Sequence, residues 1–123
     1  MAHVLIIDDD PLGRSLLRRI LTSIGHSVWE SMDGEAGLRD FRARHTDLVI
    51  CDIMLPGMDG IETIAAIRRD STQVKILVIS GGSVHCVSGD LLRTAVAAGA
   101  DRKIAKPITP DSLRTALDAL LSA

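Results

Sequence analysis

The residues of this chain with the clearest chemical potential are three consecutive carboxylates, Asp8, Asp9 and Asp10. They follow the apolar run Val4–Ile7 directly, where a buried strand must end. Neighbouring carboxylates ~4 Å apart repel one another by about 4 kcal/mol at an effective dielectric constant of ~20. Two interpretations of the triplet are therefore open: a solvated loop that caps a helix, which Asp favours, or a binding site for a cation.

Other polar residues occupy the same position behind an apolar or strand-like run: Asp52, Ser80 and Lys106. The carboxyl ends of parallel strands meet at one edge of a sheet, so these groups are expected to lie close to the acidic triplet. Oxygen ligands without nearby His or Cys favour Mg²⁺ over zinc. A magnesium ion, an ammonium and a hydroxyl around a carboxylate nucleophile are suited to phosphoryl transfer.

Five segments are predicted to be the strands that position these groups. Residues 4–7, 48–51 and 76–79 are continuous apolar runs, which are typical of parallel strands covered on both faces. Residues 26–30 and 102–105 are weaker candidates. Helical patterns separate the five segments, and this alternation predicts a doubly wound α/β fold.

The helices are predicted from their caps and their apolar stripes. The first carries an apolar stripe from Leu12 to Ile24 and is closed by Gly25. Asp10 is interpreted as its cap rather than as a metal ligand. Four more helices are expected, beginning after Asp33, after Asp59, near Leu91 and after Thr109.

Composition limits the classes of protein to consider. A chain of 123 residues is expected to form one domain, and a formal net charge of −2 argues against a nucleic-acid-binding surface. No run approaches the ~20 apolar residues of a membrane span. Cys51 and Cys86 form no CxxC pair, which favours free thiols. We expect a soluble, cytoplasmic protein.

The segments IIDDDP, ICDIMLPGMDG, VISGG and KP together resemble those of response-regulator receiver domains, the phosphoacceptor half of two-component signalling pairs. The resemblance extends from Val4 to about Leu121. It implies a flavodoxin-like sheet of strand order 2-1-3-4-5 with five helices. It also implies that residues 1–123 are a single receiver domain without an output domain, which signals through protein–protein contacts.

The resemblance implies a role for each acidic residue. Asp52 would accept a phosphoryl group from the phosphohistidine of a sensor histidine kinase or a histidine phosphotransfer protein. Asp9, Asp52 and the Met54 carbonyl would ligate Mg²⁺ directly, and Asp8 would act through water. Such a protein is not an enzyme with a separate substrate, because it promotes only its own phosphorylation and dephosphorylation.

On the same resemblance, Ser80 and Lys106 would contact the phosphoryl oxygens, and the peptide bond between Lys106 and Pro107 is commonly cis. Two positions depart from the family pattern. Lys103 stands where Tyr or Phe is frequent, and Ile108 stands where Phe is frequent. Because burying an unpaired ammonium is costly, we expect Lys103 to stay in solvent.

Two alternatives compete with this interpretation. Asp-x-Asp after a strand also resembles the start of a haloacid-dehalogenase-type phosphatase, with Asp8 as nucleophile and Asp10 as acid and base. That family requires a further acidic pair after the lysine, and it leaves Asp52 without a role. The other alternative is a degenerate receiver that binds partners without phosphorylation, although every chemical position of the motif is present.

The residues that flank the predicted site have two interpretations. The start of the first helix, at residues 11–14, and the pair Pro107 and Ile108 border the place where a histidine-bearing helix must approach. They are expected either to form the footprint of that partner or to close the edge of the core.

Overall fold

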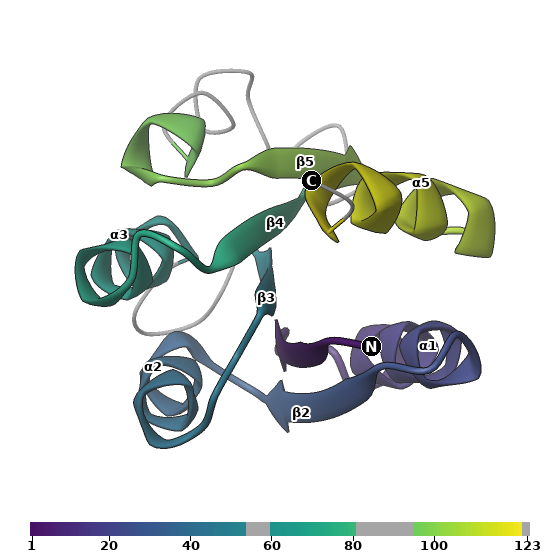
Figure 1. The fold of residues 1–123 in the computed structure, drawn as a ribbon, viewed down its shortest axis with the longest axis horizontal. Coiled ribbons are helices and arrows are strands. Elements are labelled where there is room, and N and C mark those ends of the chain that lie inside the picture. The colour runs from purple at the N-terminus through teal and green to yellow at the C-terminus, as the bar shows by residue number, and fades with distance from the viewer. Residues whose placement is uncertain (54–59, 81–94, 122–123) are drawn as a thin grey trace.

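The computed structural model of the chain describes residues 1–53, 60–80 and 95–121. Its strands are β1 (His3–Ile7), β2 (Ser27–Ser31), β3 (Leu48–Asp52), β4 (Lys75–Ser80) and β5 (Arg102–Ala105). They form one parallel sheet in the order β2-β1-β3-β4-β5, as Figure 1 shows. The predicted flavodoxin-like order is confirmed, and each strand lies within one residue of its predicted bounds.

Helices cover both faces of this sheet: α1 (Pro11–Ser23), α2 (Gly34–Ala43), α3 (Gly60–Asp70) and α5 (Pro110–Leu121). Figure 1 shows α1 and α5 on one face and α2 and α3 on the other. Residues 95–98 are also helical, while the predicted start of that helix at Leu91 and the predicted cap Asp59 lie outside the described residues. Within the described part of the chain, no helix has the length and apolar character needed to cross a membrane.

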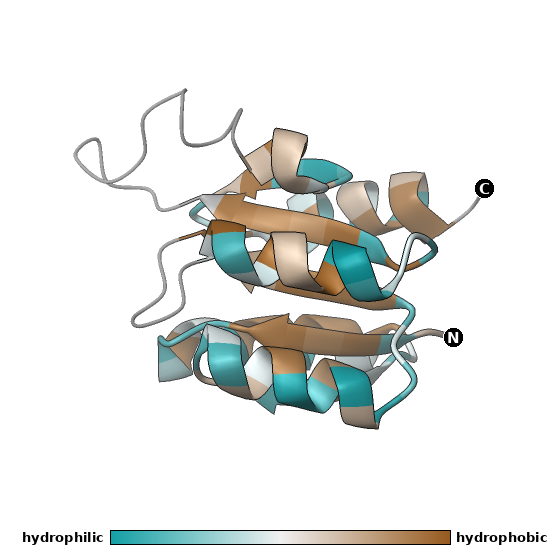
Figure 2. Cartoon of the chain, turned by 90° about the vertical axis from the view of Figure 1, so that its left-hand side faces the viewer, coloured by the Kyte–Doolittle hydropathy of each residue, from teal (hydrophilic) through white to brown (hydrophobic). Residues whose placement is uncertain are grey.

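The core has two halves, because side chains of a strand alternate between the faces of the sheet. Val4 and Ile6 of β1 pack with α1 and α5, whereas Leu5 and Ile7 pack on the α2 and α3 side. Figure 2 shows that the strands are hydrophobic along most of their length. Burial on both faces explains why the strands appear in the sequence as continuous apolar runs.

The helix ends confirm the local chemistry read from the sequence. Asp33 caps α2, its carboxylate accepting a hydrogen bond of 2.7 Å from the Ala36 amide. Thr109 and Ser112 bond reciprocally at the start of α5, at 3.0 and 3.1 Å. Gly25 follows α1 with φ at 96°, a left-handed conformation that costs glycine little.

The apolar stripe of α1 is buried only in its later part. Leu12 and Leu16, which belong to the stripe, are 80% and 40% exposed. The buried positions of the helix are Leu17, Ile20 and Leu21. Leu12 lies in the first turn of α1, which overhangs the edge of the sheet because the helix begins beyond the carboxyl end of β1.

Candidate functional site

Three carboxylates meet at the carboxyl edge of the sheet. β1 and β3 are neighbours, with Ile7 paired to Cys51, so the acids that follow these positions are brought together. Asp8, Asp9 and Asp52 each offer a ligand oxygen, and these oxygens all lie within 4.8 Å of one another. Asp8 and Asp52 are buried, and Asp9 is exposed to solvent. The predicted convergence is confirmed.

Asp8 is held at three of its four polar atoms. Its amide donates to the Ser31 carbonyl at 3.1 Å, its Oδ1 accepts from the Asp10 amide at 2.9 Å, and its carbonyl accepts from Arg14 Nη1 at 2.8 Å. Its Oδ2 is buried and has no hydrogen-bond partner among the described residues. An oxygen that has lost water and gained no donor is a strong site for a cation.

Burial is the largest cause that raises the pKa of Asp8, and the charges of Asp52 and Asp9 raise it further. The Asp10 amide and the Lys106 ammonium oppose this shift without cancelling it. A further positive charge beside Asp8 would favour the ionised form of this buried carboxyl group.

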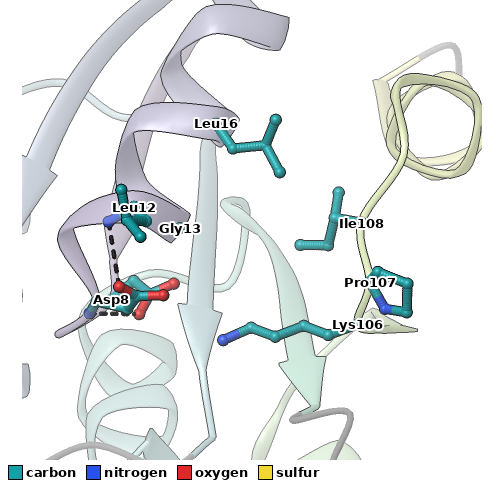
Figure 3. A pocket seen from close by; sticks show the side chains of 8 residues that line it. Asp8, Leu12, Gly13, Leu16, Lys106, Pro107 and Ile108 are labelled. Atoms are coloured by element: carbon teal, nitrogen blue, oxygen red, sulfur yellow. Dashed lines mark hydrogen bonds between the residues drawn. The ribbon is translucent and has the colours of Figure 1, made fainter.

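Lys106 brings one positive charge to the cluster from the end of β5. Its Nζ lies 3.2 Å from Asp52 Oδ2, and its side chain points toward the carboxylates in Figure 3. Burial opposes the charge on this ammonium, but the attraction of Asp52, with Asp8 and Asp10 behind it, raises the pKa of Lys106 above its usual value. Lys106 is therefore a fixed cation at neutral pH. Its peptide bond with Pro107 is cis, as expected.

The donor set fits a small, hard cation. The three candidate side-chain ligands among the described residues are carboxylates, and Asp8 Oδ2 has no hydrogen-bond donor among those residues. Mg²⁺ binds through few carboxylates and keeps several water molecules, whereas zinc favours nitrogen and sulfur ligands. The acidic pocket could thus hold a metal between Asp8, Asp9 and Asp52.

Comparison with known proteins agrees with this geometry. Residues 4–118 match the family model described as the response regulator receiver domain. The chain belongs to this family. Transcriptional regulatory protein AfsQ1 of Streptomyces coelicolor is 34% identical over 122 residues, covering 98% of this chain and 52% of that protein. TcrA of Mycobacterium tuberculosis is 34% identical over 120 residues, covering 96% of this chain and 45% of that protein.

Solved structures show the same receiver fold. The Vibrio cholerae chemotaxis protein CheY4 superimposes with a TM-score of 0.89 at 28% identity, covering 98% of this chain and 99% of that one. A CheY-like receiver domain from Methanospirillum hungatei superimposes with a TM-score of 0.91 at 26% identity, covering 99% and 94%. The chain spans about half the length of the curated relatives. The family is a signalling domain, and the phosphatase alternative is not favoured.

The other predicted residues of the receiver site are placed in part. Ser80 ends β4 opposite Ala105, so its backbone lies at the same edge as Lys106. Met54, the predicted carbonyl ligand, lies outside the described residues. Lys103 has an exposed side chain, as its charge requires, and Ile108 is partly buried against the core.

A pocket of about 380 Å³ separates the start of α1 from the segment after β5 (Figure 3). Its lining combines apolar side chains with the charged groups of the site: Asp8, Asp10, Leu12, Gly13, Leu16, Lys106, Pro107 and Ile108. Asp10 caps α1, accepting from the Leu12 amide at 3.1 Å, so its predicted capping role is confirmed. A Cβ at Gly13 would lie 2.8 Å from Asp8 Oδ2, so glycine lets the helix approach the buried carboxylate.

Gly60 is a site residue whose role the sequence analysis missed. Its amide donates to the Ile53 carbonyl at 3.1 Å, and a Cβ there would collide with the carbonyl oxygens of Asp52 and Ile53. Glycine therefore lets α3 begin directly against the main chain at the end of β3, the strand that carries Asp52. A glycine immediately after the predicted capping Asp59 was the available signal.

Proposed function

We propose that Asp52 accepts a phosphoryl group from the phosphohistidine of a sensor histidine kinase or a histidine phosphotransfer protein, in a reaction that depends on Mg²⁺. The observation that supports this most strongly is the meeting of the Asp8, Asp9 and Asp52 ligand oxygens within 4.8 Å. Lys106, 3.2 Å from Asp52, adds the cation that a phosphoryl group requires. With Mg²⁺ bound by the three acids, Asp52 would have two positive charges beside it, the metal ion and Lys106.

The proposed transfer forms one bond and breaks one. An Asp52 carboxylate oxygen attacks phosphorus, and the bond from phosphorus to the imidazole nitrogen breaks. The electron pair of that bond stays on the imidazole, which takes up one proton from solvent. Mg²⁺, when bound by Asp8, Asp9 and Asp52, supplies positive charge to the phosphoryl oxygens. Lys106 pairs with a phosphoryl oxygen through a charged hydrogen bond.

Further contacts belong to the same proposal. Ser80, whose backbone ends β4 at this edge, would donate its hydroxyl to a phosphoryl oxygen. The Met54 carbonyl would complete the metal ligands. The proposed reaction modifies the protein itself. In this proposal, residues 1–123 act as one receiver domain, which promotes its own phosphorylation and dephosphorylation. The domain then signals through contacts with other proteins.

The partner is proposed to approach across the pocket beside the carboxylates. Leu12 on α1 and Ile108 after β5 lie on opposite sides of this pocket, and Leu12 is 80% exposed. An exposed apolar side chain beside an acceptor carboxylate is suited to packing against the histidine-bearing helix of a kinase.

The proposal is tested by incubation with acetyl phosphate and Mg²⁺, followed by intact mass measurement. The wild-type protein should gain a single phosphoryl group, and Asp52→Asn should gain none, because an amide is not a nucleophile. Asp10→Asn is the matched control, since Asp10 is a cap beside the same pocket. Labelling of Asp52→Asn at the wild-type level, or an acyl phosphate mapped to Asp8, would overturn the assignment.

A further inference from the structure

Arg14 contacts the acidic site from the first turn of α1. Its Nη1 donates a hydrogen bond of 2.8 Å to the main-chain carbonyl of Asp8, and its Nε lies 3.6 Å from Glu30 on β2. The Arg14 side chain is only 19% exposed. Glu30 is also paired with Arg18 at 2.8 Å, so an arginine pair from α1 holds one acid of the neighbouring strand.

The carbonyl that Arg14 binds belongs to the peptide unit between Asp8 and Asp9. A peptide unit is planar, so holding its oxygen sets the orientation of the whole plane and the direction in which Asp9 begins. The Asp8 amide and Oδ1 are held by main-chain groups of Ser31 and Asp10. The carbonyl is held by a side chain, which a substitution can remove without breaking the main-chain contacts.

We propose that Arg14 is a positioning residue of the metal site, acting through the Asp8 carbonyl on the orientation of both Asp8 and Asp9. This inference rests on the proposed function, in which those residues hold Mg²⁺. Residues that orient metal ligands commonly change metal affinity tenfold to a hundredfold when they are replaced.

The charge of Arg14 has the opposite effect on a bound cation, because a guanidinium repels Mg²⁺. Glu30 lies 3.6 Å from Arg14 Nε and offsets this charge. Because this ion pair weakens the repulsion, we expect the positioning effect to dominate, so that removal of Arg14 weakens Mg²⁺ binding.

The test compares Arg14→Met with Arg18→Met. Both substitutions remove an arginine of α1 that pairs with Glu30, but only Arg14 contacts Asp8. Calorimetric titration with Mg²⁺ should show an affinity about tenfold or more below wild type for Arg14→Met, and near wild type for Arg18→Met. Wild-type affinity in folded Arg14→Met, or an equal loss in both variants, overturns the proposal.

A milder variant covers the case in which Arg14→Met does not fold. Arg14→Lys keeps the charge and can reach either Asp8 or Glu30, but it has no planar group that binds both. Its Mg²⁺ affinity should fall several-fold, and an affinity equal to that of the wild type counts against the role of Arg14.

A measurement without metal separates this inference from the proposed function. The Asp9 amide nitrogen shares a peptide unit with the Asp8 carbonyl, so its NMR resonance should shift in metal-free Arg14→Lys and stay in place in Arg18→Met. An unmoved Asp9 resonance overturns the positioning role. Failure of the wild-type protein to bind Mg²⁺ instead overturns the proposed function.

Discussion

Asp8 and Asp10 show how neighbouring acids of one motif take different roles. Asp10 is exposed and caps α1 through a hydrogen bond to the Leu12 amide. Asp8 is fully buried, with one carboxylate oxygen bonded and the other without a donor among the described residues. Two aspartates of one motif thus differ in role: Asp10 caps a helix, and Asp8 is a buried carboxylate that is only partly hydrogen-bonded.

The ranking of the acids can be tested by titrating Mg²⁺ into Asp9→Ala and Asp10→Ala. Asp9→Ala should lose much more affinity, because Asp9 belongs to the carboxylate cluster and Asp10 is bonded to the helix. Isothermal titration calorimetry gives the ranking directly. Equal losses would mean that the capping residue is also a metal ligand.

The buried charge of Asp8 predicts how the stability of the metal-free protein depends on pH. Burial raises the folded-state pKa of Asp8 above the ordinary Asp value of 3.8. Its contribution to stability is therefore complete below that value and is lost as pH rises through the higher folded-state pKa. Asp8→Asn removes this loss, so the variant should be more stable than wild type at neutral pH.

Thermal unfolding without Mg²⁺, measured from acid to neutral pH, provides the check. The advantage of Asp8→Asn should shrink as the pH falls, since the wild-type carboxyl then becomes neutral as well. Asp10→Asn is the control, because Asp10 is exposed. A variant that is less stable than wild type at neutral pH would show that the unpaired oxygen carries no penalty.

At the scale of elements, α1 combines two surfaces. Its later turns bury Leu17, Ile20 and Leu21 against the sheet, while Leu12 in its first turn and Leu16 in its second turn are exposed beside the site. The same helix therefore supports the core and offers an apolar surface beside the carboxylates.

The exposed turn leads to a prediction for Leu12→Ala. Transfer from a cognate kinase should slow about fivefold or more, because truncation of an apolar side chain in a well-packed contact costs more than ~1 kcal/mol. Labelling by acetyl phosphate should be unchanged, since that donor needs no docking surface. Val96→Ala is the control, because Val96 is an exposed apolar residue that does not line the pocket. If both rates fall together in Leu12→Ala, the substitution affects the site and the docking proposal is wrong.

At the scale of the whole molecule, the two edges of the sheet have different roles: one carries the candidate site, and the other stabilises the fold. At the carboxyl edge, several carboxylates lie close together and repel one another. At the amino edge, a hydrogen-bond network centred on Arg68 and Asp101 stabilises the fold. Arg68 donates to the carbonyls of Val74 and Gly99, each at 2.8 Å, and to the Asp101 carboxylate at 2.8 Å. The Asp101 carboxylate also accepts from the Ile76 amide at 2.8 Å.

Because the two networks lie at opposite edges of the sheet, a substitution at the amino edge should lower stability without changing Mg²⁺ binding or phosphorylation. Arg68→Met should lower the free energy of unfolding by about 2 kcal/mol or more, because it leaves partly buried carbonyls without donors. The folded variant should bind Mg²⁺ and take up phosphoryl groups as the wild type does, because Arg68 lies at the opposite edge of the sheet. Denaturant unfolding and Mg²⁺ titration measure the two quantities. A loss of Mg²⁺ affinity in the folded variant would contradict the separation.

Much of this fold could be predicted from the sequence, because its signals are local. Continuous apolar runs mark strands that are buried on both faces, and Asp33 and Thr109 cap the helices that follow them. The acids lie at strand ends, and the parallel sheet brings strand ends together whatever the details of packing. The sequence by itself therefore determined the α/β class, the edge that carries the site and the acids that meet there.

Only the tertiary structure decided which atoms of these residues are satisfied and which are not. The exposure of Leu12 depends on how far α1 extends past the end of β1, and the close approach at Gly60 depends on where α3 meets β3. The contact from Arg14 to the Asp8 carbonyl arises in the same way, as does the lack of a donor to Asp8 Oδ2 among the residues that the structure describes. Such features depend on distances between separate elements, which the pattern of residues along one element does not contain.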